Sequence, residues 1–324
     1  MVVVTGGAGF IGSNLVYKLN NEGIDNILIF DSFVGSNTQT KWKNLLGLKF
    51  KDVIDKSRIF DVLSGFEKID FIFHFGAKTS TTEDNFGIIL LENYEFSKRL
   101  FLLSMEKKAK FVYASSAATY GSGEFGFKDN EEILEKLRPL NPYAMSKHLF
   151  DLWLYRNGYL KHALGLKFFN VFGPGEYHKG EMRSFVLKAY DQIKEKGFVK
   201  LFKSFVPEIP DGEQKRDFIY VKDAVDITFY LSQKGLTGIF NVGTGEARSF
   251  NELVKAVFSS LNLEVKIQYF DPPDNIKKQY QNFTQAEISK LQSTGYKIEN
   301  LRDFNGKIKD YVCNYIISGK TIAG

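Results

Sequence analysis

The chain of 324 residues has few of the side chains that covalent cross-links and metal sites require. Cys313 is the only cysteine, so an intramolecular disulfide is impossible and a reducing, cytoplasmic location is expected. The histidines are dispersed without ligand spacing, and we expect no metal site. No apolar run reaches the roughly 18 residues of a membrane span, and the apolar start lacks the basic flank of a signal peptide. We therefore expect no membrane partner.

A strong excess of one charge is also missing. Lysine and arginine number 43 against 38 aspartates and glutamates, and the basic residues are scattered. Nucleic-acid binding is therefore not expected, whereas a mild positive balance suits anionic small molecules. With 44% hydrophobic and 25% charged residues the composition is that of an ordinary globular protein, and it gives no sign of a disordered tail or a coiled coil.

Short apolar runs alternate with longer amphipathic stretches through the first half, which is the pattern of βαβ units in a doubly wound parallel sheet of the α/β class. The predicted strands are Val2–Thr5, Asn26–Asp31, Ser57–Phe60, Phe71–Phe75, Lys110–Ala114 and Leu164–Asn170. The predicted helices run from about Gly9 to Glu22, Glu92 to Lys108 and Pro142 to Gly158.

The regular alternation ends after Asn170 in a turn-rich passage with several glycines. A helix is predicted near Glu181–Lys196 and another near Ser249–Leu261, and the strand-like RDFIYV and GIFNVG return the chain towards the sheet. We predict a Rossmann domain of residues 1–170 with returning segments at about 221–247 and 284–297. The predicted smaller, interleaved substrate domain consists of about 171–220, 248–283 and 298–324.

The string TGGAGFIG follows the first strand and opens a helix, with Gly6, Gly9 and Gly12 at three-residue spacing. Gly6 permits a tight turn, Gly9 lets the backbone approach a pyrophosphate, and Gly12 allows close helix packing. The phosphates then lie at a helix N-terminus, where N–H groups favour negative charge. The sequence therefore predicts a dinucleotide site.

The residues leave the identity of the dinucleotide open. Asp31, at the end of the second strand, is placed to bind an adenosine ribose and favours NAD, because a carboxylate repels a 2′-phosphate. Lys41 and Lys56 are candidate counter-charges for such a phosphate and favour NADP.

The string YAMSK places Tyr143 and Lys147 four residues apart on a predicted helix, so that both side chains project from one face. A tyrosine with a pKa near ~10 is a poor base at neutral pH, and we expect the Lys147 ammonium to lower that pKa. Tyr143 then accepts the proton of a hydroxyl that is being oxidised, and Ser116, in YASSAATYG, hydrogen-bonds the same oxygen.

With these motifs in order, the chain resembles the extended short-chain dehydrogenase/reductase family along its length. HFGAKT, FFNVFGPG, RDFIYVKD and FNVGTG match further landmarks of that family. The resemblance implies a nicotinamide cofactor and catalytic Ser116, Tyr143 and Lys147. Dehydratases and decarboxylases of the family need a carboxylate after the serine, where this chain has Ala117 and Ala118. An epimerase or a plain oxidoreductase remains.

Within the family, the chain is more closely similar to the subfamily of ADP-heptose 6-epimerases. TGGAGFIGSN, STTE at 80–83, HKG at 178–180 and QYQNFTQAE carry this resemblance. It implies inversion of the sixth carbon of an ADP-activated heptose for the lipopolysaccharide core, NADP as cofactor with NAD possible, and a homo-oligomer, a pentamer. The implied cofactor residues are Gly6, Gly9, Phe10, Ile11, Gly12, Asp31, Ser32, Lys41, Lys56, Phe75, Gly76, Ala77, Lys78, Thr79, Asn93, Lys147, Val171 and Lys179.

Lys179 in HKG is the distinguishing residue, because inversion needs proton handling on both faces of the oxidised carbon. The resemblance implies that Lys179 is the second acid/base, opposite Tyr143. It places Asn170, Phe202, Arg216 and Tyr280 at the sugar nucleotide, together with Ser116, and Arg216 suits the diphosphate. Glu181 and Lys188 stand where the subfamily commonly has a small polar residue and a histidine, and they are weaker substrate candidates. A UDP-hexose 4-epimerase and a non-catalytic NADP-binding regulator are the alternatives.

Overall fold

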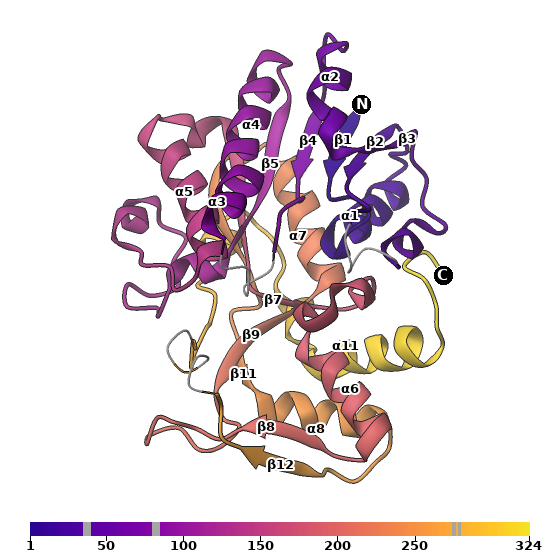
Figure 1. The fold of residues 1–324 in the computed structure, drawn as a ribbon, viewed down its shortest axis with the longest axis vertical. Helices are drawn as coiled ribbons and strands as arrows, with labels where there is room; N and C mark the ends of the chain where they lie inside the picture. The colour runs from indigo at the N-terminus through magenta and orange to yellow at the C-terminus, as the bar shows by residue number, and fades with distance from the viewer. Residues whose placement is uncertain (35–39, 80–84, 274–276, 278–279) are drawn as a thin grey trace.

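A seven-stranded parallel sheet forms the centre of the protein (Figure 1). The computed structural model describes residues 1–34, 40–79, 85–273, 277 and 280–324. The strand order reverses between β1 and β4, and open α/β sheets bind ligands at such a switch point. The predicted α/β class is therefore confirmed. In sheet order the strands are β10 (Gly238–Val242), β6 (Ala163–Phe168), β5 (Lys110–Ser116), β4 (Phe71–His74), β1 (Val2–Thr5), β2 (Ile27–Asp31) and β3 (Asp52–Asp55).

Helices cover both faces of this sheet, which is why its central strands β1 and β2 are buried along their whole length. Successive side chains of β1 point to opposite faces, so Val2 and Val4 join one core cluster and Val3 joins another. The first face is covered by α1 (Phe10–Asn21) and α7 (Val221–Gln233), which pack against each other. The second face is covered by α2 (Ile59–Ser64), α4 (Phe96–Glu106) and α5 (Pro142–Arg156). The short helix α3 (Phe86–Ile89) leads into α4 through the π turn η3 (Leu90–Glu95).

Two small sheets lie at the carboxyl end of the large sheet, at the bottom of Figure 1. One contains β11 (Ala247–Ser249), β9 (Lys215–Tyr220) and β7 (Asn170–Phe172), and the other pairs β12 (Ile267–Phe270) with β8 (Val199–Phe202). The helices packed around them enclose a separate apolar core. Besides α7, the helices of the second half in the described residues are α6 (Phe185–Lys196), α8 (Phe250–Ser260), α10 (Ser289–Ser293) and α11 (Phe304–Tyr311). The domain boundaries proposed from the sequence stay a prediction.

Short helical turns complete the chain between these elements. The 3-10 turns are η1 (Lys41–Leu45), η2 (Lys56–Arg58), η4 (Ala117–Tyr120), η5 (Glu131–Lys136), η6 (Tyr159–His162), η7 (Tyr177–Met182) and η8 (Glu299–Arg302), and η9 (Val312–Ile317) is a π turn. Within the described ranges, no helix is long and apolar enough to cross a bilayer.

The predicted strand Ser57–Phe60 is wrong. The third strand is β3, and it ends at Asp55 because that carboxylate accepts a hydrogen bond from the Ser57 backbone N–H at 2.9 Å and starts η2. The apolar residues that follow belong to the helix α2, where Ile59 and Leu63, one turn apart, are fully buried.

The second half also corrects three expectations. The predicted strand Leu164–Asn170 is two strands, because the chain leaves the large sheet after Phe168 and β7 pairs with β9. RDFIYV therefore extends the small sheet, while GIFNVG returns to the large one as β10. The helix predicted from Glu181 begins at Phe185, where the Ser184 hydroxyl caps it.

Candidate active site

The glycine loop joins β1 to α1 at the carboxyl edge of the sheet, and at Gly6 and Gly12 its backbone is packed too closely for a side chain. Gly6 has φ +70°, and a Cβ there would lie 2.7 Å from the Gly76 nitrogen. A Cβ on Gly12 would lie 2.1 Å from the Gly6 carbonyl oxygen, and one on Gly9 would lie 3.0 Å from the same atom. Without side chains at these glycines, a phosphate can approach the start of α1. The N–H groups of the first helical turn favour its negative charge.

A continuous groove runs along this edge as two adjoining cavities of about 710 and 570 Å³. Both cavities are lined by Gly6, Asp31, Lys41, Gly76 and Ala77. A groove of this size, with a cradle that a Cβ would fill, fits a dinucleotide. Every residue predicted for the cofactor lines one of the two cavities except Asn93, Lys147 and Val171.

Asp31 ends β2 beneath the groove, as the sequence predicts, and is only 5% exposed. Its carboxylate accepts hydrogen bonds from the backbone N–H groups of Ala8 at 2.8 Å and Ser32 at 2.7 Å. The Lys41 ammonium forms an ion pair with it, and Lys56 pairs with Glu92 across the groove. Lys41 therefore offsets the carboxylate charge that would otherwise repel a 2′-phosphate.

Asn93 contacts protein rather than the groove. Its amide accepts from the Lys78 N–H at 2.8 Å and donates to the Lys78 carbonyl at 3.0 Å and to the Ser146 hydroxyl at 3.0 Å. It therefore holds the segment after β4 against α5. The STTE string at 80–83, and Gln279 of QYQNFTQAE, lie outside the described residues.

Ser116 is the last residue of β5, and Tyr143 and Lys147 are one turn apart on α5. The helix begins here because the Asn141 side chain caps it, accepting from the Ala144 N–H at 2.8 Å, and Pro142 takes its first position. Tyr143 forms a hydrogen bond with Ser116. The structure therefore brings the strand-end serine to the helical tyrosine.

The pKa values of this group differ from the expectation drawn from the sequence. Burial raises the pKa of Tyr143, and the hydrogen bond with Ser116, rather than the charge of Lys147, opposes the rise. Burial lowers the pKa of Lys147 to about 8, and the charge of Asp151 opposes that change. In this state Tyr143 is a neutral phenol beside an amine that titrates close to neutral pH.

A buried polar network that the sequence analysis missed lies behind these residues. Asp151 accepts from the Lys167 ammonium at 2.6 Å and from the hydroxyls of Tyr113 and Ser115, each at 2.8 Å. Lys167 also donates to Thr119 at 2.6 Å. Asp151 and Lys167 are buried, and the network ties β5, β6 and α5 together. Asp151 follows Lys147 by four residues, and this spacing is the signal in the sequence from which the network could have been predicted.

Lys179 lies in η7 and lines the larger cavity together with Phe10 of α1 and Ala114 of β5. Its ammonium lies 5.4 Å from the centre of the Phe10 ring, a cation–π contact. Burial lowers the pKa of Lys179, and the charge of Glu176 opposes that shift. The loop lysine therefore faces the same groove as the glycine loop and the end of β5.

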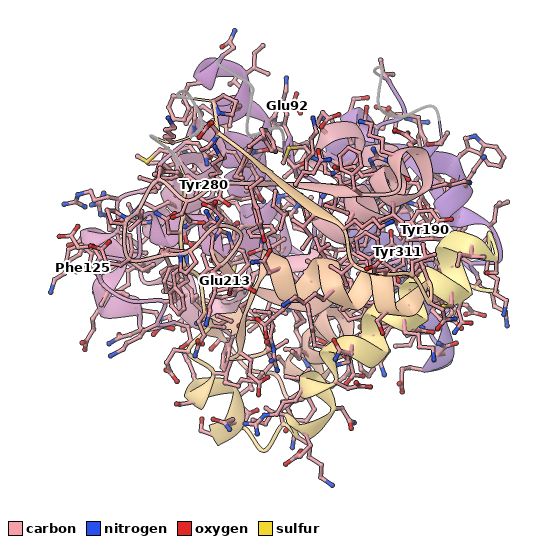
Figure 2. All side chains as sticks on the ribbon, turned by 90° about the horizontal axis from the view of Figure 1, so that it is seen from below. Glu92, Phe125, Tyr190, Glu213, Tyr280 and Tyr311 are labelled. Atoms are coloured by element: carbon pink, nitrogen blue, oxygen red, sulfur yellow. The ribbon has the colours of Figure 1, made fainter. Side chains whose placement is uncertain are left out.

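The substrate candidates divide into two groups. Arg216 is 7% exposed, and its guanidinium lies 5.0 Å from the centre of the Tyr280 ring, which in turn packs against Phe202 at 6.1 Å between centroids. Figure 2 shows Tyr280 at the left of the view, away from α11. Phe205 joins this cluster 5.7 Å from Tyr280. The structure thus gathers a buried cation and several aromatic faces, which suit a nucleotide diphosphate.

The remaining candidates lie apart from that cluster. Lys188 donates to the Glu181 carbonyl at 2.5 Å and forms an ion pair with the Glu181 carboxylate at 3.3 Å. The two residues that depart from the subfamily pattern therefore bind each other. Glu181 also lines the larger cavity. Asn170 is exposed at the start of β7.

A switch-point groove with a glycine cradle, beside a serine, a tyrosine and a lysine, defines a nucleotide-dependent oxidoreductase or epimerase site. The chain belongs to the NAD dependent epimerase/dehydratase family, whose model matches residues 2–243. It is 44% identical to an ADP-L-glycero-D-manno-heptose-6-epimerase of Nitratidesulfovibrio vulgaris over 320 residues, 98% of each chain.

Solved structures agree with this assignment. The Helicobacter pylori ADP-L-glycero-D-manno-heptose-6-epimerase superposes with a TM-score of 0.78 at 32% identity, covering 97% of this chain and 95% of the other. A UDP-glucose 4-epimerase of Thermus thermophilus in complex with NAD gives 0.75 at 26% identity, covering 96% and 97%. The family resemblance drawn from the sequence is confirmed.

Proposed function

We propose that this protein is an isomerase that inverts the sixth carbon of ADP-D-glycero-D-manno-heptose to give ADP-L-glycero-D-manno-heptose, a precursor of the lipopolysaccharide core. The observation that carries the proposal is the position of Lys179. It lines the dinucleotide groove together with the glycine loop and β5, whereas two alanines follow Ser116. A second proton carrier at the nicotinamide site suits inversion, and the alanines do not suit dehydration.

We propose NADP as the cofactor. The fit rests on the glycine cradle, on the open start of α1, and on Lys41 and Lys56 along the groove. Lys41 neutralises Asp31 and can also face a 2′-phosphate, so this edge tolerates the extra negative charge. When bound, NADP supplies the hydride acceptor for the sixth carbon and then the hydride donor.

The chain's own side chains supply the proton transfers. One of Tyr143 and Lys179 removes the hydroxyl proton as the carbon is oxidised, and the other protonates the oxygen after the ketone has turned over in the pocket. Ser116 hydrogen-bonds the substrate oxygen and Tyr143. Burial raises the pKa of Tyr143, and the hydrogen bond with Ser116 opposes the rise. We propose that the Lys147 ammonium stabilises the phenolate when it forms.

The rest of the substrate is held further out. We propose that Arg216 binds the diphosphate through its planar guanidinium, with Phe202 and Tyr280 against the nucleotide. Asn170 and Glu181 are proposed to contact the sugar, and Lys188 acts by holding Glu181. We further propose a cytoplasmic homo-oligomer, which light scattering on the purified protein tests.

The runner-up is a UDP-hexose 4-epimerase, favoured by the likeness to the T. thermophilus structure. Purified protein is incubated separately with ADP-D-glycero-D-manno-heptose and with UDP-glucose, and the stereochemistry is followed by NMR. Inversion of the heptose at its sixth carbon alone supports the proposal. Inversion of the hexose alone overturns it. Identification of the nucleotide that copurifies with the protein decides between NADP and NAD.

A further inference from the structure

A buried carboxylate precedes Lys179 in the same turn. Glu176 is 1% exposed, and the Lys179 backbone N–H donates to its carbonyl oxygen at 3.0 Å. The two residues are therefore fixed one turn apart. Nothing in the sequence analysis or in the proposed mechanism gives Glu176 a role.

Hydrogen bonds from three parts of the chain converge on the Glu176 carboxylate. It accepts from the Ser184 hydroxyl at 2.6 Å and from the Ser184 backbone N–H at the start of α6. The Tyr311 hydroxyl of α11 donates to it at 2.9 Å, and the Gly173 N–H donates at 3.4 Å. Figure 2 shows Tyr311, the last residue of α11, at the right of the view. Burial raises the pKa of the Glu176 carboxyl, and the hydrogen bonds from Ser184 and Tyr311, together with the charge of Lys179, oppose that rise.

The other side of the turn is held by two buried asparagines of the nucleotide-binding half. Asn14 donates to the Pro174 carbonyl at 2.8 Å, and Asn44 donates to the Gly175 carbonyl at 2.8 Å and to the Ala8 carbonyl at 3.0 Å. The turn that carries Lys179 is thus clamped between the glycine loop and the helices α6 and α11.

The charge of Glu176 acts on the Lys179 amine and also raises the pKa values of Tyr177 and Tyr311. Glu176 is the charged group that raises the pKa of the Lys179 amine. Burial lowers the pKa of Lys179 and Glu176 raises it, so the two effects oppose each other at one amine.

The histidine next to Lys179 and three tyrosines around the turn are neutral near pH 7. Burial lowers the pKa of His178 to about 4, with Lys41 and Lys179 contributing and Asp31 opposing. Burial raises the pKa values of Tyr177, Tyr220 and Tyr311, and Tyr315 lies close to Tyr177. Glu181 follows Lys179 and is paired with Lys188.

We propose that Glu176 is a positioning residue for the epimerisation, which holds the Lys179 amine at the groove and sets the charge with which that amine meets the substrate. The proposal rests on the proposed function, because it concerns Lys179 as a proton carrier. The effect of the Glu176 charge on the Lys179 amine does not depend on the proposed function and can be measured without the substrate.

The test is Glu176→Gln, which keeps the shape and loses the charge. Acetic anhydride reacts only with a neutral amine. The rate of Lys179 acetylation is measured at a series of pH values by mass spectrometry of the peptide that contains Lys179. Its pH dependence gives the midpoint of the Lys179 titration. Loss of the negative charge of Glu176 should move the Lys179 midpoint down by about one pH unit. The limb of the epimerisation pH profile that belongs to Lys179 should move the same way in both reaction directions.

Two variants serve as matched controls. Glu131→Gln removes a part-buried carboxylate that also accepts a backbone N–H, at Ile239, and should leave the Lys179 midpoint unchanged. Tyr311→Phe removes one donor but keeps the charge of Glu176, so it should raise KM or lower kcat with little movement of the midpoint.

An unmoved Lys179 midpoint in folded Glu176→Gln overturns the inference. If that variant does not fold, Glu176→Asp decides, because it draws the charge back by one methylene: a smaller downward shift supports the role and no shift refutes it. A wild-type protein that does not epimerise the heptose refutes the proposed function instead, and the acetylation midpoints still report on the electrostatic coupling.

Discussion

Lys147 illustrates a conflict between stability and catalysis that can be measured. It is 5% exposed, and burial lowers its pKa from 10.5 to about 8. Below about pH 8 the folded protein therefore holds a charge that the unfolded chain solvates better. At about 1.4 kcal/mol per pKa unit, the difference makes the folded state less stable by roughly 3 kcal/mol at neutral pH. The side chain is retained although it weakens the fold.

Replacing Lys147 by Met keeps the aliphatic stem and removes the charge. We expect the variant to be more stable than the wild type at neutral pH by up to roughly 3 kcal/mol, and to lose epimerisation. The advantage should be complete below about pH 8 and shrink as pH rises towards 10.5, because the wild-type lysine is then neutral in both states.

Urea unfolding followed by tryptophan fluorescence at a series of pH values measures this difference. Trp153 lies on α5, the helix that carries Lys147, and so reports on the region that changes. A variant that is less stable than the wild type at neutral pH would refute the reasoning, as would a gain in stability that is the same at every pH.

Four further substitutions test the site and the network behind it. Tyr143→Phe and Lys179→Met should each lower kcat for epimerisation by about 10²-fold or more, since each removes a proton carrier; unchanged turnover in either variant excludes that residue. Lys41→Met should weaken NADP binding by about tenfold or more and NAD binding less, because Asp31 is then unpaired, and equal losses by calorimetry would contradict the assignment. Asp151→Asn should destabilise the fold by about 3–5 kcal/mol, because Lys167 stays buried without its partner, and a change under about 1 kcal/mol in urea unfolding would show that the network is not holding that charge.

Local patterns were enough to predict the large sheet and the groove. The apolar run of β1, the glycine spacing and Asp31 at the end of β2 each depend on neighbours within a few residues. The predicted strand Ser57–Phe60 failed for a similar local reason, since one carboxylate at Asp55 turned the chain into a 3-10 helix before the apolar residues.

The features that the sequence did not reveal depend on contacts between distant segments. Tyr311 reaches Glu176 from 135 positions away, and Asn44 reaches Gly175 from 131. The pKa of Tyr143 could not be read from its spacing to Lys147 either. Burial raises that pKa and the hydrogen bond with Ser116 opposes it, and burial is a property of the whole fold.

The two amines of the site share one electrostatic arrangement. Burial lowers the pKa of both Lys147 and Lys179, and in each case a carboxylate about one turn away, Asp151 or Glu176, opposes the change. The difference lies in what else each carboxylate binds. Asp151 is paired with the Lys167 ammonium at 2.6 Å, so part of its field is cancelled, whereas hydrogen-bond donors alone surround Glu176 in the described part of the chain. The charge of Lys179 should therefore depend more strongly on its carboxylate than that of Lys147 does, which suits a residue that has to both give and take a proton in one catalytic cycle.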